Sequence, residues 1–311
     1  MISNSKRKCR MCKNEGISKN ADIDLIHHRL SLCKEHYKKW YERRVSRTIK
    51  KFKMISENDN VLIAVSGGKD SLALWYCLNN LGFNVDGIFI DLGIPGNSEE
   101  SKEVCLKLAE KLGCKLHIAK LEEFIAPLPS LEKMKIKPVC SLCGTLKRYY
   151  INKFARDLGY TVVATGHNLD DEVSVLFGNV LNWNIEYLQK QYPVLEKEMG
   201  FVKKIKPLCL NFDIENLYYC KFLEIEYKEG ACPYSKKATS LQRKKILEQI
   251  EKEFPGAKLN FYLQFLKRIY PILGERVHRS ALRRCEICKE PSSNKVCSVC
   301  VIREKFDKFK I

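Results

Sequence analysis

The order of apolar and polar positions in the middle of the chain predicts strands that alternate with helices. Short apolar runs predict four strands, at residues 61–65, 85–91, 115–120 and 161–165. Apolar residues at helical spacing predict four helices, at residues 71–81, 98–112, 146–158 and 169–181. A glycine follows each of the first three helices, which is typical of helix C-termini (Gly82, Gly113 and Gly159). This alternation indicates βαβ units, and therefore an α/β fold whose parallel sheet is covered by helices on both faces.

A glycine-rich loop lies between the first predicted strand and the first predicted helix. It consists of Ser66, Gly67, Gly68, Lys69, Asp70 and Ser71. A helix N-terminus has unsatisfied backbone N–H groups and the positive end of the helix dipole, so it favours an anion such as phosphate. The Walker-type loop separates its glycines by four residues, whereas these two are adjacent, which excludes that loop. The sequence therefore predicts a phosphate site of another kind, and an ordinary glycine turn is the alternative.

Two further loops are expected to share one rim with the glycine-rich loop. Ligands of parallel α/β sheets bind beyond the carboxyl ends of the strands. Asp91 ends the second predicted strand, and Gly166 and His167 follow the fourth. We therefore expect these three residues to lie beside the predicted phosphate site.

Composition and charge narrow the class of protein. The chain has 311 residues with 45% hydrophobic content, which is enough for one sizeable core. Its 55 Lys and Arg residues exceed its 37 Asp and Glu residues, and the net charge of +18 favours nucleic acid over a membrane as the partner. We expect a cytoplasmic protein, because the sequence has no run of 18 apolar residues and no apolar signal-peptide stretch. A lysine-rich solvated surface is the alternative reading of the charge.

Fifteen cysteines in such a chain indicate metal chemistry rather than disulfides. Two sets of four residues have the spacing of structural zinc sites: Cys9, Cys12, Cys33 and His36, and then Cys285, Cys288, Cys297 and Cys300. Each set would close a module too short to fold by its apolar core alone. We therefore predict two Zn²⁺ sites. His27 and His28 fall outside the first ligand set, where we expect them to contact RNA or to cap the module.

A third group of cysteines differs from these two sets. Cys140 and Cys143 form a pair without a second pair, and Cys232 lies downstream between Ala231 and Pro233 in a predicted loop. Three cysteines can hold a 4Fe-4S cluster and leave one iron open for chemistry. The alternatives are a zinc site with three thiolates and a redox pair formed by Cys140 and Cys143 alone. The other five cysteines are predicted to be buried thiols (Cys77, Cys105, Cys114, Cys209 and Cys220).

A basic amphipathic helix is predicted at residues 43–53, between the first zinc module and the core. It is a candidate for following an RNA backbone, and a solvated linker is the alternative. The chain then divides into five expected segments: a zinc finger at 1–42, a basic linker helix at 43–56, a catalytic domain at 57–233, a helical extension at 234–279 and a zinc ribbon at 280–311.

Together these motifs resemble the TtuA branch of the TtcA/TtuA tRNA 2-thiouridine synthetases, which are PP-loop ATP pyrophosphatases. The resemblance covers nearly the whole chain: the first zinc module, the SGGKDS loop, the central C-x2-C, the sequence TGHNLDDE, the late CPY and the zinc ribbon. It implies a PP-loop catalytic domain of the HUP-like, Rossmann type. It also implies an enzyme that adenylates the C2 oxygen of a tRNA uridine with ATP and Mg²⁺, then inserts sulfur with a 4Fe-4S cluster.

The resemblance assigns roles to individual residues. The six residues of the glycine-rich loop would bind the ATP phosphates, and His167 would help to form the nucleotide pocket. The cluster would be held by Cys140, Cys143 and Cys232. Lys147 and Asp171 would lie beside the substrate, although their sequence context alone indicates exposed helix charges.

The resemblance also implies a substrate position and partners. Details of the motifs favour uridine 54 in the T loop over the wobble uridine 34. Position 34 stays an alternative, as does another PP-loop enzyme that adenylates tRNA and uses persulfide or nitrogen chemistry. The expected partners are tRNA and a ubiquitin-like thiocarboxylate protein or free sulfide, and the expected assembly is a homodimer. Besides the tRNA thiolase and another PP-loop enzyme, a third hypothesis is a zinc-dependent RNA-binding protein without catalysis. The complete SGGKDS loop argues against this third hypothesis.

Overall fold

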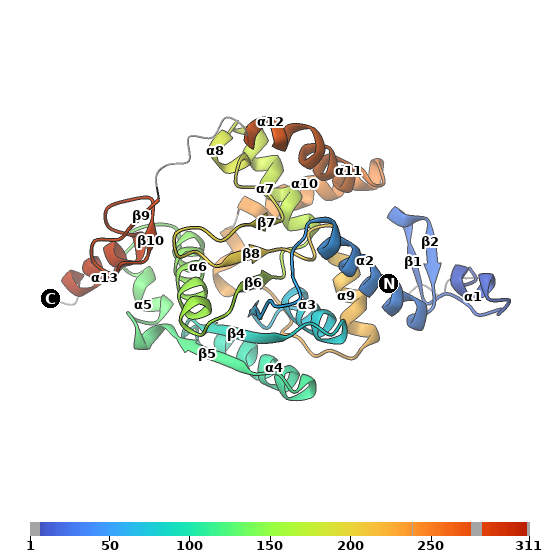
Figure 1. The fold of residues 1–311 in the computed structure, drawn as a ribbon, viewed down its shortest axis with the longest axis horizontal. Helices are drawn as coiled ribbons and strands as arrows, with labels where there is room; N and C mark the ends of the chain where they lie inside the picture. The colour runs from blue at the N-terminus through green and yellow to red at the C-terminus, as the bar shows by residue number, and fades with distance from the viewer. Residues whose placement is uncertain (1–6, 238, 275–281, 310–311) are drawn as a thin grey trace.

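The centre of the molecule is a six-stranded sheet, in a computed structural model that describes residues 7–237, 239–274 and 282–309 (Figure 1). The strands lie in the order β5-β4-β3-β6-β8-β7. β7 runs antiparallel to β8, and the other neighbouring pairs are parallel. The bounds are Val61–Val65 (β3), Val85–Asp91 (β4), Leu116–Lys120 (β5), Val162–Thr165 (β6), Val194–Leu195 (β7) and Lys203–Ile205 (β8). The predicted α/β fold with a parallel sheet is confirmed, and the structure adds β7 as an antiparallel edge strand.

The strand order reverses at β3, and this reversal positions the site. The chain passes from β3 to β4 and β5 on one side, then returns to β6 on the other side of β3. The crevice between the carboxyl ends of β3 and β6 is therefore a topological switch point, where such folds bind ligands. The glycine-rich loop follows β3 and Gly166 follows β6, so both lie at this crevice.

Four helices connect the strands, close to where the sequence predicts them. They are α3 (Lys69–Asn80), α4 (Asn97–Leu112), α6 (Val139–Asp157) and α7 (Leu169–Leu181). α6 begins at Val139, well before the predicted residue 146, because burial of Leu142 against the sheet outweighs the low helix propensity of Gly144. Cys140 therefore lies in the first turn of a helix.

Successive residues of β3 face two different apolar cores. Val61 and Ile63 belong to the larger core, which includes buried residues of α3, α7 and α9 (Asp213–Phe222). Leu62 belongs to the second core, which includes buried residues of α6 and of the short helix α5 (Leu128–Glu132). Side chains alternate between the faces of a strand, so the two cores cover the two faces of the sheet.

The N-terminal module packs on α9 at one end of the molecule (Figure 1). Its elements are α1 (Arg10–Asn14), β1 (Ile23–Leu25), η1 (Ile26–His28), β2 (Leu30–Leu32) and α2 (Lys34–Lys51). The predicted basic helix is continuous with this module, because α2 starts directly after Cys33 and ends at Lys51. The buried hydroxyls of Tyr37 and Tyr41 donate hydrogen bonds to α9, to the Glu215 carbonyl oxygen (2.6 Å) and to Asn216 Oδ1 (2.7 Å). These bonds fix α2 against the core.

From residue 239 onward, the chain forms a helical segment and a small ribbon. The helical segment packs on α7 and contains α10 (Thr239–Glu253), α11 (Ala257–Gln264), the π-helical η4 (Phe265–Ile269) and α12 (Tyr270–Gly274). The ribbon packs on α6 and contains β9 (Arg283–Arg284), β10 (Pro291–Ser292) and α13 (Ser298–Phe309). Shorter elements elsewhere are η2 (Leu121–Glu123), α8 (Ile185–Leu188) and η3 (Pro233–Lys237). Within the described ranges, no helix is both long and apolar enough to cross a membrane.

Candidate active site and metal sites

The glycine-rich loop needs its two glycines for different reasons. Gly67 has a φ of +77°, and a Cβ atom there would lie 2.7 Å from Ser101 Cα, so backbone and packing both require glycine. Gly68 has an ordinary φ of −81°, and its Cβ atom would meet the Ser66 hydroxyl at 3.5 Å, which is a normal contact. The described residues around Gly68 therefore do not demand glycine. Its missing side chain leaves open space at the N-terminus of α3, where a phosphate group fits.

Ser71 and Gly166 hold the two loops of the crevice together. The Ser71 hydroxyl accepts a hydrogen bond from the Ser66 backbone N–H (3.1 Å) and donates one to the Gly68 carbonyl oxygen (3.0 Å). A Cβ atom on Gly166 would lie 2.8 Å from the Ser71 backbone nitrogen. Because Gly166 has no side chain, the loop after β6 can approach the start of α3 closely.

Lys69 and Asp70 form a charged network with Asp213 at the start of α9. The Lys69 ammonium lies 2.7 Å from Asp213 Oδ1 and 3.0 Å from Asp70 Oδ2. Burial opposes a charge on Lys69, but the two carboxylates outweigh burial and raise its pKa. Burial also raises the pKa of Asp70, against the opposing effect of Lys69. The network thus gathers one cation and two carboxylates beside the open space at Gly68.

Two buried amides complete this network. Asn168 Nδ2 donates hydrogen bonds of 3.2 Å to Asp70 Oδ1 and Asp213 Oδ1, and Asn216 Nδ2 donates one of 2.8 Å to Asp70 Oδ1. Asp213, Asn168 and Asn216 were not among the predicted site residues. Asn168 belongs to the TGHNLDDE motif, which was a usable signal. The other two come from α9, whose sequence matches no motif.

His167 and Asp91 lie at the same edge of the sheet. His167 is exposed, yet the surrounding protein disfavours its charged form and lowers its pKa, and Lys204 adds to this effect. His167 Nδ1 lies 2.9 Å from the hydroxyl oxygen of Thr165, the last residue of β6. Asp91 Oδ1 accepts a hydrogen bond from the Gly93 backbone N–H (3.0 Å), and Asp91 Oδ2 lies 3.9 Å from Lys102 Nζ. Asp91 therefore shapes the turn after β4, and its contact with a nucleotide stays a prediction.

Asp171 is tied into the first turn of α7. Its backbone N–H and its carboxylate each form a hydrogen bond with Asn168, which is the capping box that begins the helix. Asp171 Oδ1 also lies 2.5 Å from Lys244 Nζ on α10. Burial would raise the pKa of Asp171, but Lys244 and the hydrogen bonds outweigh burial and lower it. Asp171 is therefore a half-buried carboxylate that is held ionised.

The three cysteines of the central group lie in one neighbourhood. Cys140 and Cys143 are in the first turns of α6, and Cys232 is in the loop before η3. Cys140 Sγ lies 3.5 Å from the Tyr234 carbonyl oxygen, and this contact joins the Cys232 loop to the helix. Burial raises the pKa of the Cys143 thiol, on which Lys147, Cys232 and Cys140 also act electrostatically. Cys140 and Cys232 are exposed, so the group is open to a ligand.

A hydrogen bond of Gly67 connects the phosphate loop to the segment that leads to Cys232. Burial raises the pKa of the Cys105 thiol to about 12, and the Gly67 backbone N–H and Lys147 on α6 act against burial. The Gly67 carbonyl oxygen accepts a hydrogen bond of 2.8 Å from the Lys228 backbone N–H. The segment that leads to Cys232 therefore starts at the phosphate loop, and the two parts of the candidate site are adjacent.

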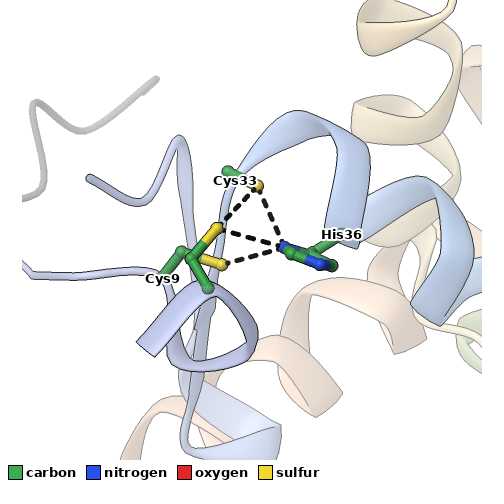
Figure 2. A group of neighbouring side chains, drawn as sticks. Cys9, Cys33 and His36 are labelled. Atoms are coloured by element: carbon green, nitrogen blue, oxygen red, sulfur yellow. Dashed lines mark hydrogen bonds between the residues drawn. The ribbon is translucent and has the colours of Figure 1, made fainter. Parts of the chain in front are cut away.

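The N-terminal ligand set converges on one point (Figure 2). The ligand atoms of Cys9, Cys12, Cys33 and His36 all lie within 4.8 Å of one another. His36 Nδ1 lies 3.5, 3.3 and 3.3 Å from the sulfur atoms of Cys9, Cys12 and Cys33. His36 Nε2 lies 3.3 Å from Glu15 Oε1, an outer contact that orients the ring. This set can hold one metal ion.

The C-terminal ligand set converges in the same way. Cys285 Sγ lies 3.8 Å from Cys300 Sγ, and Cys288 Sγ lies 3.6 Å from Cys297 Sγ. Backbone N–H groups of Cys297 and Cys300 donate to the sulfur atoms of Cys285 (3.2 Å) and Cys297 (3.4 Å). Such donors stabilise thiolates, which are the form that binds metal. This set can also hold one ion.

Of the remaining cysteines, Cys114 is half-buried and four are buried (Cys77, Cys105, Cys209 and Cys220). Cys220 Sγ lies 3.4 Å from the Lys69 carbonyl oxygen, beneath the phosphate loop. Cys114 Sγ accepts a hydrogen bond of 3.2 Å from Asn79 Nδ2. These thiols pack against neighbouring elements.

His27 and His28 join the N-terminal module to the core. His28 Nε2 lies 2.6 Å from Glu215 Oε1 on α9. The His27 ring stacks on Phe212 with ring centroids 4.3 Å apart, and its Nδ1 lies 2.7 Å from Glu251 Oε1 on α10. Local spacing could not indicate this docking role, because the partners lie far away in the sequence.

Comparisons with known proteins agree with this arrangement. A family model described as a PP-loop domain matches residues 39–182. The tRNA-5-methyluridine(54) 2-sulfurtransferase of Thermotoga maritima is 46% identical over 306 residues, which cover 97% of this chain and 98% of that protein. The chain therefore belongs to the family of tRNA-5-methyluridine(54) 2-sulfurtransferases. A family protein from Pyrococcus horikoshii is 40% identical over 94% of this chain and 92% of its own length. The resemblance to the PP-loop tRNA 2-thiouridine synthetases is confirmed.

A solved structure of another thiolase matches the fold of this chain over nearly its whole length. The U34-tRNA thiolase NcsA from Methanococcus maripaludis, with its [4Fe-4S] cluster, matches with a TM-score of 0.80 and 28% identity. The match covers 98% of this chain and 97% of the thiolase. The predicted enzyme class, a PP-loop tRNA sulfurtransferase, is therefore confirmed. The sequence identity of this chain to the relatives named for position 54 is higher than its identity to the U34-tRNA thiolase.

Two half-buried lysines of this family member carry no signal in the sequence. Burial lowers the pKa of Lys204 on β8 to about 8, and repulsion by Lys206 and Arg148 contributes. Lys206 pairs with the buried carboxylate of Glu172 at 2.7 Å. In a chain so rich in lysine, only the fold distinguishes these side chains from solvated ones.

Proposed function

We propose that this enzyme converts uridine 54 in the T loop of tRNA to its 2-thio form. The C2 oxygen of the uridine attacks ATP and releases pyrophosphate, then sulfide attacks C2 and AMP leaves, so a C–S bond replaces a C–O bond. The relatives named for position 54, at 46% and 40% identity, support this position over the wobble uridine named for the 28% identical thiolase. The observation that carries the proposal is the hydrogen bond between Gly67 and Lys228, which joins the phosphate loop to the segment that leads to Cys232.

The phosphate loop is suited to the pyrophosphate end of ATP. Backbone N–H groups at the start of α3 and the open space at Gly68 favour phosphate oxygens. Lys69 supplies a cation that stays protonated. Asp70 and Asp213 are suited to Mg²⁺, which proteins bind through one or two carboxylates together with substrate phosphates. His167, at the same rim, is suited to the nucleoside.

Cys140, Cys143 and Cys232 are suited to a 4Fe-4S cluster with one open iron. Within the described ranges, the groups whose ligand atoms lie within 4.8 Å of one another are the two terminal sets. The central cysteines are therefore spaced more widely than the ligands of a single ion, which favours a cluster over a three-thiolate zinc site. When bound, the cluster would present sulfide at its open iron. Lys147 adds a cation that favours the thiolates.

Asp171 and Lys147 are suited to the charges that the reaction creates. Asp171 is held ionised by Lys244, so its carboxylate is suited to accept a hydrogen bond from the uridine N3–H as the C2 oxygen attacks ATP. Lys147 lies close enough to Cys143 and Cys105 to act electrostatically on both thiols, between the cysteine group and the phosphate loop. A cation there favours the negative charge that develops during sulfur attack.

Both terminal ligand sets are suited to Zn²⁺. A tetrahedral zinc ion with Zn–S bonds of about 2.3 Å separates its sulfur ligands by about 3.8 Å. The observed sulfur pairs of the ribbon lie 3.8 and 3.6 Å apart, and Cys12 Sγ lies 3.8 Å from Cys33 Sγ. The four-ligand sets leave no open position, which is typical of structural zinc.

The sulfur donor and the assembly rest on the family resemblance. The donor is a ubiquitin-like thiocarboxylate protein or free sulfide, and the enzyme acts as a homodimer. A thiolation assay with each donor in turn separates the two sources. Light scattering on the purified protein tests the dimer, and a monomer at working concentrations would contradict it.

The decisive experiment measures iron, acid-labile sulfide and zinc in anaerobically purified protein. We expect about four irons and two zincs per chain. Cys232→Ala should lose iron and tRNA thiolation but keep zinc, whereas Cys114→Ala, at a half-buried cysteine outside the group, should keep all three. Thiolation by iron-free wild-type protein would favour a persulfide passed between Cys140 and Cys143. ATP that stays intact with tRNA present would contradict adenylation.

A further inference from the structure

One side of α2 carries a row of exposed cations. They follow one another at intervals of four, four and three residues: Lys39, Arg43, Arg47 and Lys50. Residues at these intervals lie on the same side of a helix, about one turn apart. The opposite side carries the buried residues Tyr37, Tyr41, Val45 and Ile49. We call the row of four cations the basic ridge.

The basic ridge is held in place by the core. The ring of Tyr41 stacks on that of Tyr219 in α9, with centroids 4.0 Å apart. Arg44, a half-buried cation of the same helix, donates to the Leu210 carbonyl oxygen and lies 3.7 Å from Glu215 Oε2. Arg44 thus fastens the helix, whereas the ridge cations point away from the core. Because the helix backbone is already fixed, a ligand that binds the ridge has to order only the side chains.

The ridge cations have no ion pair with a carboxylate in the part of the chain that the structure describes. Glu42, the one acidic residue that α2 places among them, directs its Oε1 elsewhere. That oxygen accepts hydrogen bonds from Asn80 Nδ2 (2.9 Å) and the Tyr219 hydroxyl (2.8 Å). Uncompensated charges of one sign create a local potential that attracts a polyanion.

Hollows border the ridge on both sides. One of about 360 Å³ lies between α2 and α1 and is also lined by Met11, Trp40 and Lys51. The other, of about 440 Å³, is also lined by Ser46 and Leu81. Three of the four ridge cations line both hollows. The ridge therefore stands clear of its surroundings, so an extended ligand can reach the cations from either side.

We propose that the basic ridge binds the phosphodiester backbone of tRNA. Its cations repeat about every 6 Å along the helix, comparable to the spacing of phosphates along a strand, and each neutralised phosphate releases counterions. The inference rests on the proposed function, which supplies tRNA as substrate, and adds the place where the RNA is held. α9 lies between the basic ridge and the candidate active site, because it packs on α2 and its first residue, Asp213, belongs to the Lys69 network. The part of the tRNA that the ridge binds is therefore distant from the reacting uridine.

The chemistry of this face suits RNA better than an acidic protein. No large hydrophobic side chain of α2, which the structure describes throughout, is exposed. Protein interfaces depend on buried aromatic and apolar anchors, whereas contacts with phosphates need cations alone. A protein sulfur donor would therefore find no anchor on the ridge.

The test compares two fourfold variants of the holoenzyme with equal loss of charge. The ridge variant is Lys39→Gln, Arg43→Gln, Arg47→Gln and Lys50→Gln. The control variant replaces four exposed lysines of α4, β5 and the segment between them: Lys107→Gln, Lys111→Gln, Lys115→Gln and Lys120→Gln. The measurements are the dissociation constant for unmodified tRNA across a salt series, the steady-state constants for thiolation, and the iron and zinc content.

We expect the ridge variant to bind tRNA at least tenfold more weakly than the control, with KM raised and kcat kept. Its slope of log affinity against log salt should flatten by about three, at roughly 0.7–0.9 per lost phosphate contact. A variant with Lys39→Arg and Lys50→Arg should bind like the wild type. If the ridge and control variants had the same affinity for tRNA and the same salt dependence, the proposed role of the ridge would be wrong, even with thiolation intact. Loss of donor-protein binding with tRNA binding unchanged would overturn it as well. Wild-type holoenzyme that neither binds nor thiolates tRNA would overturn the proposed function itself.

Discussion

Arg156 on α6 and Glu290 in the C-terminal ribbon form a two-point ion pair. Arg156 Nη1 lies 2.6 Å from Glu290 Oε2, and Nη2 lies 2.5 Å from Oε1. The Glu290 side chain is 8% exposed, and its hydrogen bonds raise the pKa of Arg156 further above its ordinary value. Because α6 also carries Cys140 and Cys143, the ribbon is fastened to the helix that we assign to the cluster.

Replacing this arginine should loosen the ribbon. In Arg156→Ala the buried Glu290 carboxylate has no partner of opposite charge from α6, so we expect a loss of about 1–3 kcal/mol in unfolding free energy. Thermal unfolding and the rate of zinc release to a chelator measure it. Arg156→Lys keeps the charge but not the two-point geometry, and should fall between the wild type and Arg156→Ala. An Arg156→Ala protein as stable as the wild type would contradict a structural role for the pair.

The two glycines of the phosphate loop should respond differently to alanine. Gly67→Ala forces a side chain into the left-handed region and against Ser101, so we expect a loss of about 2 kcal/mol or more in stability. Gly68→Ala meets only an ordinary contact with Ser66, so its stability should stay close to the wild type, while its affinity for ATP falls. Thermal unfolding and calorimetric titration with ATP separate the two effects. Full ATP affinity in Gly68→Ala would contradict a phosphate position above that residue.

Lys204 should make stability depend on pH. Its folded-state pKa of about 8 lies below its ordinary value of 10.5, so the folded protein disfavours the proton. Stability contributed by this group is lowest below pH 8 and rises as the pH increases from 8 to 10.5. Lys204→Met should therefore stabilise the protein at pH 7 by about 2 kcal/mol, with a smaller gain at pH 9. Lys203→Met is the control, because Lys203 Nζ donates instead to the Lys53 carbonyl oxygen (3.0 Å). A pH-independent effect of Lys204→Met would contradict the shift.

Two histidines of the N-terminal module should differ in their effect on metal content. His36→Ala removes a proposed ligand, so we expect one zinc per chain instead of two and faster hydrogen exchange in β1 and β2. His28→Ala should keep both zincs, yet lose about 1–3 kcal/mol of stability because the buried Glu215 carboxylate loses a partner. Metal analysis and hydrogen exchange distinguish the two variants. Two zincs in His36→Ala would remove His36 from the ligand set.

The sequence by itself determined the elements around the phosphate loop. β3 and β4 have the predicted bounds, and α7 does as well, because buried strands are short apolar runs and Asn168 caps α7 with its own side chain. Each of these signals lies within a few residues of the element it defines. The spacing of the terminal ligand sets is local in the same sense, since each pair is separated by two residues. Local physics suffices for such features.

Tertiary structure alone decided which distant residues enter the site. Lys69 meets Asp213 across 144 positions, and His28 meets Glu215 across 187 positions. Two residues so far apart produce no recognisable local pattern in the sequence, because neither residue constrains the backbone of the other until the chain has folded. The same reason explains why Asp171 was expected to be an exposed helix charge in the absence of a family resemblance. Only the packing of α10 on α7 brings Lys244 to it and holds it ionised.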